Sequence, residues 1–177
     1  MNLNNRFSSK NICEILVSKG VITKSQAADI FKKKDAVKKK ILERKKKESP
    51  ALAATFKHSS ISIIDVIVLL NISRTDKIFG VLDEDGIYQI LSEEWGLVYR
   101  KIDPLKLDLN IVTTIIPRTF AKKHEVLPLD IKDGRLTVAV SDPFNQEVIS
   151  DISKVSQMMV DVVMIAVVEV VIIAVNQ

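Results

Sequence analysis

Few side chains in this chain of 177 residues have the type and spacing that catalysis or metal binding requires. It has two histidines, His58 and His124, and one cysteine, Cys13, which cannot make the clustered Cys/His set of a zinc site. No GxxxxGK[ST] loop is present to hold nucleotide phosphates, and no GxSxG elbow is present to support a Ser/His/Asp hydrolase. We therefore expect no catalytic residue, no metal site and no enzyme activity from this sequence.

The run from Lys32 to Lys47 (KKKDAVKKKILERKKK) has the charge needed to bind anions. It holds ten basic and two acidic residues, a local charge of +8, whereas the rest of the chain has 16 basic and 20 acidic residues. Two interpretations are open, a solvated helix face and a contact with phosphates through Lys38, Lys39, Lys40 and Arg44. No aromatic side chain interleaves these lysines for base stacking, so the solvated face is favoured. For the alternative, lipid head groups are the most plausible phosphates.

The basic run is predicted to lie on the second helix of an N-terminal hairpin. Apolar residues at helical spacing indicate a first helix from Lys10 onward, and Gly20 follows it as the residue that ends the helix. Thr23 and Gln26 have capping-box spacing, so they predict the start of a second helix that continues through the lysines. A DNA-binding helix-turn-helix has a similar outline, but the acids Asp29 and Asp35 lie nearby. A structural hairpin is favoured because helix pairs are far commoner than DNA readers.

Two more helices are expected before Gly96. The apolar run from Ile61 to Ile72 predicts a buried helix, although its β-branched residues leave a strand open. The segment DEDGIYQILSEEWG predicts a helix that opens with acidic residues and stops at Gly96. Its inner face is expected to consist of Ile87, Ile90, Leu91 and Trp95.

The pattern changes after Gly96 to short strands and helices. Asp133 and Gly134 separate VLPLDI from RLTVAV, which is the pattern of a two-residue hairpin. Ser141-Asp142-Pro143 is expected to start a helix that runs over Asn145 to Val155. The other expected elements are a strand at LVYRKI, a turn at Asp103-Pro104, and helices at Leu109 to Ile116 and Arg118 to His124.

The apolar segment from Met158 to Val175 has two interpretations. It could be a membrane helix, but Asp161 and Glu169 would each cost about 2.5 to 3.5 kcal/mol near the bilayer centre. The preferred prediction is a strand from Val160 to Ala166 and a helix from Val168, which gives the order ββαβα.

Together these elements predict an α+β fold, with an N-terminal helical subdomain followed by a compact α/β domain. The expected division is a helical hairpin with the basic helix at 1–49, a second helical segment at 50–96, and an α/β subdomain at 97–177. The single Cys13 and the absence of an apolar leader at the N-terminus indicate a cytoplasmic setting.

Three stretches resemble a known family, the N-terminal domain (MshEN or GspE N-terminal type) of type II secretion and type IV pilus assembly ATPases. They are IPRTFAKKHEVLPLDIKDGRLTVAVSDP, EEWGLVYRKIDPLKLDLNIV and ILVSKGVITKSQAADIF. The resemblance implies a non-catalytic docking or regulatory domain that binds the cytoplasmic part of an inner-membrane platform protein, notably the secretion system's L component. It implies a cytoplasmic protein held peripherally at the inner membrane through its partners. The ATPase motor domain would then follow in a longer chain, or the protein is a stand-alone relative.

Some members of that family bind cyclic di-GMP through paired 24-residue motifs, and the first motif falls on Asn11 to Lys34. Asn11 stands where the family has arginine, which removes a cation able to pair with phosphate, and Cys13 stands where it has glycine. The second copy, at Ile63 to Glu94, is interrupted. Docking is therefore favoured over cyclic di-GMP sensing, and no other cofactor is expected. The candidate nucleotide-binding residues are Asn11, Ile12, Leu16, Val17, Gly20 and Lys34.

Overall fold

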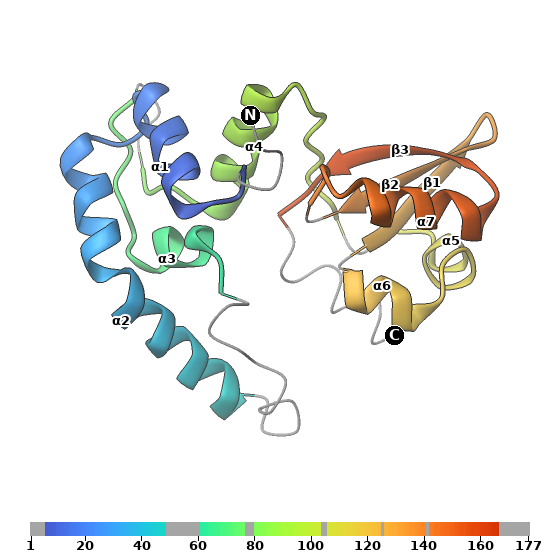
Figure 1. Ribbon diagram of the computed structural model, residues 1–177, viewed down its shortest axis with the longest axis horizontal. Helices are drawn as coiled ribbons and strands as arrows, with labels where there is room; N and C mark the ends of the chain where they lie inside the picture. Colours follow the sequence, from blue (N-terminus) through green and yellow to red (C-terminus); the bar gives the residue numbers. More distant parts are fainter. Residues whose placement is uncertain are drawn as a thin grey trace. The chain divides into compact units, whose positions relative to one another are not determined.

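The computed structural model describes residues 6–48, 61–76, 80–103, 106–124, 126–140 and 142–166. The chain divides into two compact units, Met1–Leu91 (unit 1) and Ser92–Gln177 (unit 2). Unit 1 is helical and unit 2 combines a sheet with helices, so the predicted α+β class is confirmed (Figure 1). The predicted boundary at residues 49 and 50 lies outside the described residues, and the three-part division stays a prediction.

The first part of the chain is helical, and the first helix ends at a capping residue that the sequence predicts. Gly20 follows the first helix with φ of +69°. Its N–H donates to the Val17 carbonyl at 3.0 Å, and the Val21 N–H donates to the Leu16 carbonyl at 2.9 Å. This is the Schellman arrangement that ends many helices, and it confirms the predicted stop. The helices are α1 (Ser9–Ser18), α2 (Lys24–Glu48), α3 (Ile63–Leu69) and α4 (Glu84–Trp95).

The long helix α2 begins with the predicted capping box. The Thr23 N–H donates to Gln26 Oε1 at 2.7 Å, and the Gln26 N–H donates to Thr23 Oγ1 at 3.1 Å. The helix continues through the lysine run, as predicted, and its Ile30 is fully buried. At 25 residues it is about 37 Å long.

The apolar run after residue 60 forms helix α3, so the strand alternative is wrong there. Ser62 caps the helix through a reciprocal pair of hydrogen bonds with Asp65. This capping box stabilises the start of a helix, although β-branched residues follow it. The side chains of Ile63, Ile64, Val66 and Ile67 are buried.

Helix α4 places its inner face slightly differently from the expectation. Ile87 and Leu91 are fully buried as predicted, but Tyr88 is also buried, whereas Ile90 and Trp95 are half-buried. In an α-helix Ile90 lies about 100° around the axis from Leu91, so it cannot share the centre of the buried stripe. Gly96 ends the helix with φ of +67°.

Unit 2 is built on a three-stranded sheet in the order β1-β2-β3. β1 and β2 pair in antiparallel fashion, and β2 and β3 pair in parallel, with Thr137 opposite Asp130 on one side and Asp161 on the other. The hairpin turn has φ of +51° at Asp133 and +72° at Gly134, the backbone that a two-residue type I′ turn requires. The elements are α5 (Leu109–Thr114), α6 (Arg118–His124), β1 (Val126–Lys132), β2 (Arg135–Val140), α7 (Gln146–Ser156) and β3 (Met159–Met164).

Two predicted boundaries in unit 2 need correction. The strand expected at LVYRKI is reduced to one parallel bridge between Tyr99 and Met164, beside the end of β3. Helix α7 begins after Asn145 and not at Asp142-Pro143. The Asn145 side chain accepts the Val148 N–H at 3.2 Å, so it is the N-cap, and the proline precedes the helix instead of lying in its first turn.

The apolar segment after Met158 starts as strand β3, which pairs along its length with β2. The membrane-helix interpretation is therefore wrong for residues 159–164, because a strand in a mixed sheet cannot also be part of a spanning helix. The helix predicted from Val168 lies outside the described residues. Within the described ranges, no helix has the length and apolar character needed to cross a membrane.

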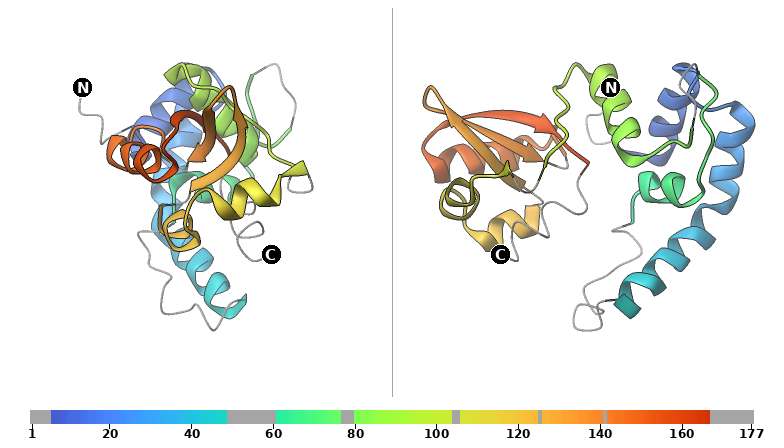
Figure 2. Two further views of the ribbon diagram at one scale, coloured as in Figure 1. Left: turned by 90° about the vertical axis from the view of Figure 1, so that its right-hand side faces the viewer. Right: turned by 180° about the vertical axis from the view of Figure 1, so that it is seen from behind.

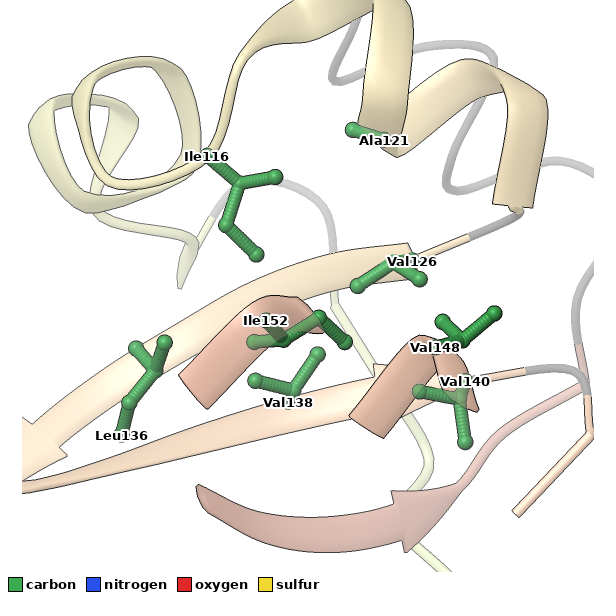
Figure 3. Packing of buried hydrophobic residues seen from close by; sticks show 8 residues of the cluster. All are labelled: Ile116, Ala121, Val126, Leu136, Val138, Val140, Val148 and Ile152. Atoms are coloured by element: carbon green, nitrogen blue, oxygen red, sulfur yellow. The ribbon is translucent and has the colours of Figure 1, made fainter. Parts of the chain in front are cut away.

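A cluster of buried hydrophobic residues in unit 2 lies on one face of the sheet, between the strands and helices α6 and α7. Alternate residues of β2 point to this face, and Ile152 and Val148 of α7 lie against them, as Figure 3 shows. From the loop before α6 and from α6 itself, Ile116 and Ala121 complete the cluster. The buried residues of this cluster are Ile116, Ala121, Val126, Leu136, Val138, Val140, Val148 and Ile152.

Candidate functional site

A groove of about 430 Å³ lies between α1 and α2 in unit 1. Each helix contributes residues three or four apart, which is the spacing that lines one helix face. The floor is mostly apolar, and two lysines and one glutamate lie among the lining residues. The lining consists of Lys10, Cys13, Glu14, Val17, Ser18, Lys24, Ala27 and Phe31.

The predicted nucleotide-binding residues are divided between this groove and the core. Val17 lines the groove, but Ile12 and Leu16 are 1% and 0% exposed, so their side chains face the core of unit 1. Gly20 is exposed in the turn after α1, and Lys34 lies over the Phe31 ring at 5.9 Å from its centroid. The structure does not gather these residues into one surface.

Asn11, one of the predicted nucleotide-binding residues, forms hydrogen bonds at the start of α1. Its backbone N–H donates to Oγ of the N-cap Ser8 at 3.2 Å, and its side-chain Nδ2 donates to the Arg6 carbonyl at 2.8 Å. The side chain is half-buried and its amide group is already used in a local hydrogen bond. Asn11 therefore orders the chain before α1 and presents no cation.

The electrostatics of the groove do not produce a nucleophile. Burial, with a smaller contribution from the negative charge of Glu14, raises the pKa of the Cys13 thiol to about 11. At neutral pH Cys13 is thus a protonated, buried thiol. The Lys10 ammonium lies 3.8 Å from the Glu14 carboxylate, and both side chains are well exposed.

The lysine run extends along α2 as predicted. Lys39, Lys40 and Arg44 are exposed and Lys38 is half-buried, so the four predicted anion-contact residues do not lie on one face. In the part of the chain that the structure describes, no group of three or more His, Cys, Asp or Glu side chains could hold a metal ion.

Two arginine–carboxylate pairs in unit 2 were not predicted from the sequence. Arg100 Nη1 lies 2.9 Å from Asp130 Oδ2, and Arg135 pairs with Asp161 through two donors. A hydrogen bond from the Thr137 side chain, and then Arg100, lower the pKa of the Asp130 carboxyl. Arg135 and Asp161 lie on the paired strands β2 and β3, so the strand register brings this pair together. Arg100 lies outside the three strands, next to the Tyr99 bridge, and pairs with Asp130 of β1.

The sheet and helices of unit 2 correspond to a known domain family. The family described as the MshEN domain matches residues 95–169, which include α5, α6, α7 and all three strands. Residues 95–169 are therefore similar to an MshEN domain. The groove and the lysine run lie before the matched residues.

Three known proteins are similar to this chain. The type IV pilus assembly ATPase TfpB of Acinetobacter baylyi is 31% identical over 80 residues, 45% of this chain. The chain spans 13% of the length of that relative. A solved structure of MshE with cdg has a TM-score of 0.55 at 14% identity and covers 93% of this chain and 96% of that chain, which shows that the fold is shared. The N-terminal domain of XpsE has a TM-score of 0.45 at 15% identity, covering 79% of this chain and 91% of that one.

Proposed function

We propose that this chain is the non-catalytic docking domain of a type IV pilus or type II secretion assembly ATPase. In this role it binds the cytoplasmic part of the inner-membrane platform protein and so holds the motor against the membrane. The observation that carries the proposal is the MshEN domain at residues 95–169, supported by the relationship to a pilus assembly ATPase. In a longer chain, the ATPase motor domain would follow it.

The surface of the MshEN domain suits a protein partner better than a small substrate. Among its described residues, Met159 and Val98 are the two most exposed large apolar side chains, at 65% and 60%. Apolar side chains of this kind form the centre of protein interfaces, where their burial contributes most of the affinity. Both lie on or beside the β3 edge of the sheet, so we expect this edge to contribute to the contact.

Calorimetric titration tests the proposal. We expect the cytoplasmic domain of the platform protein to bind the 177-residue chain saturably, without lipid, with a dissociation constant of about 10 μM or tighter. The cytoplasmic domain of an unrelated inner-membrane protein serves as the control partner. An absence of heat and of co-elution with the cognate domain would show that the docking role is wrong.

Matched substitutions then test the proposed edge. Met159→Ser and Val98→Ser should each weaken binding by about fivefold or more, because each removes apolar area from the interface. Val81→Ser, 49% exposed and located in unit 1, is the control and should leave binding unchanged. If wild-type chain binds and all three variants bind equally well, the partner contacts another surface.

A second candidate function is cyclic di-GMP sensing. It is supported by the fold shared with the solved MshE structure that contains cdg, and by the placement of a family-like motif over Asn11 to Lys34. Two features weaken it. Asn11 offers an amide where the motif has a cation, and the side chains of Ile12 and Leu16 are occupied in the core.

Titration with cyclic di-GMP separates the two candidates. We expect no binding up to about 100 μM, because a site without its arginine loses charge-assisted hydrogen bonds to phosphate. The variant Asn11→Arg is the informative comparison, since it restores a cation at that position. Micromolar binding by the wild-type chain would place nucleotide sensing above docking.

A further inference from the structure

We propose that the exposed face of α2 binds an anionic membrane surface through three lysine pairs, which we call the lysine stripe. The pairs are Lys32-Lys33, Lys39-Lys40 and Lys46-Lys47. This interaction is separate from the docking role, because the stripe lies outside the MshEN domain and needs no protein partner.

The pairs recur at intervals of seven residues along one helix. Seven residues advance an α-helix by about 10.5 Å and complete nearly two turns, so successive pairs are rotated by only about 20°. All six lysines are exposed, whereas Lys34, Lys38 and Lys45 on the opposite side of the helix are half-buried. The sequence therefore places six ammonium groups on one side of a straight rod over about 22 Å.

The arrangement of unit 1 leaves much of this helix accessible. In Figures 1 and 2, α3 lies beside the earlier turns of α2, and the teal turns at the C-terminal end continue beyond α3. Within the described residues, no ion pair joins a lysine of the stripe to a carboxylate. The six charges are thus available to an external anion.

Charge separation along the chain favours a surface of negative charge as the occupant. The run Lys32 to Lys47 has a charge of +8, with ten basic and two acidic residues, and the rest of the chain is net acidic. An anionic surface would therefore attract the lysine stripe and repel the net acidic rest of the chain, which orients the stripe toward the surface. Each basic residue close to an anionic leaflet adds favourable energy, so the six lysines reinforce one another.

A lipid surface fits the stripe better than nucleic acid does. The pairs lie along a straight line that a flat surface contacts along its whole length. Glu43 is exposed between the second and third pairs. A helix that binds in a DNA groove mostly presents hydrogen-bond donors to the base edges, and Glu43 presents a carboxylate instead. No aromatic residue occurs from Lys32 to Lys47 for stacking on unpaired bases.

Vesicle co-sedimentation of the 177-residue chain tests the proposal. The vesicles contain about 30% phosphatidylglycerol in phosphatidylcholine, with pure phosphatidylcholine vesicles and a 20-base-pair DNA duplex compared in the same low-salt buffer. We expect binding to the anionic vesicles alone, and its loss as salt rises toward about 0.5 M because screening shortens the reach of the charges.

Charge-neutralising variants locate the surface. Lys39→Gln/Lys40→Gln should weaken vesicle binding by about 25-fold, at about fivefold for each lysine, while glutamine preserves helix propensity. The matched control Lys123→Gln/Lys132→Gln removes the same charge from exposed lysines of unit 2 and should change binding by less than about twofold. Glu43→Gln should strengthen binding by a few-fold.

Three results would overturn the proposal. The first is no binding of the wild-type chain to anionic vesicles at low salt. The second is an equal loss in the stripe variant and in the matched control, which would mean that net charge and not the stripe matters. The third is duplex binding as tight as vesicle binding, which would mean that the stripe binds nucleic acid.

Discussion

The substitution Ile152→Ala tests whether the hydrophobic cluster of unit 2 is packed as described. Ile152 is 0% exposed on α7 and lies among the core residues of the sheet (Figure 3). The change removes three buried carbon atoms, at about 0.8 kcal/mol each, so the transfer cost alone is about 2.4 kcal/mol. The cavity that remains raises the expected loss of unfolding free energy to between about 2 and 5 kcal/mol.

Urea unfolding followed by tryptophan fluorescence measures this loss within unit 2. The chain has one tryptophan, Trp95, whose ring meets Phe144 edge-on with centroids 5.4 Å apart. Both residues belong to unit 2, so the fluorescence change reports on the unit that contains the substitution. The midpoint should fall while the slope of free energy against urea stays constant.

Val155→Ala is the matched control on the same helix. Val155 is 48% exposed, so its truncation should cost less than about 0.5 kcal/mol. Equal effects of the two substitutions, or a loss below about 1 kcal/mol for Ile152→Ala, would refute the description of the core.

Three further predictions concern single groups. Burial raises the pKa of the Cys13 thiol from 9.0 to about 11, so at pH 8 it should react with a disulfide reagent about 100-fold more slowly in the folded chain than in urea. The raised pKa also contributes stability below pH 9.0 that is lost as pH rises through about 11. Thr137→Val should raise the pKa of Asp130, measured by NMR titration of its carboxyl, because it removes the hydrogen bond that contributes most to lowering that pKa from 3.8. The lowered pKa contributes stability above pH 3.8 that is lost as pH falls through the folded value, and in the variant this contribution should be smaller because the folded pKa lies closer to 3.8. Gly134→Ala should cost about 1 to 2 kcal/mol in thermal or urea unfolding, since the turn holds φ at +72° and no atom within 4 Å would obstruct the added methyl group.

Local chemistry allowed most elements to be predicted from the sequence. The Thr23–Gln26 capping box and the Asp133-Gly134 turn depend on residues a few positions apart, and both are present in the structure. The start of α7 was harder, because Asp142-Pro143 and Asn145 both supply helix-start signals. The hydrogen bond from Val148 to the Asn145 side chain decides between them.

Long-range pairing was the part that the sequence could not supply. The segment LVYRKI has a strand-like composition, but only Tyr99 forms a bridge with Met164. Likewise, nothing in the spacing of Arg100 and Asp130, or of Arg135 and Asp161, indicates that they pair. The register between β2 and β3 sets the second contact, and the path of the chain after α4 sets the first. Both are properties of the folded unit.

The candidate nucleotide residues illustrate the same limit for a site. A motif places Ile12, Leu16 and Val17 together in the sequence, but helical geometry turns them to different sides of α1. Ile12 and Leu16, four residues apart, share the buried face, while Val17 borders the groove. Whether a family motif remains a binding site therefore depends on which face of the helix its residues occupy.

The most direct test of the docking role is calorimetric titration of the chain with the cytoplasmic domain of its platform protein in lipid-free buffer at about 0.3 M salt, where binding through the lysine stripe is screened. We predict saturable binding that Met159→Ser or Val98→Ser weakens and that Lys39→Gln/Lys40→Gln leaves unchanged. No binding by the folded wild-type chain under these conditions would contradict the proposal that the MshEN domain docks an assembly motor to its platform.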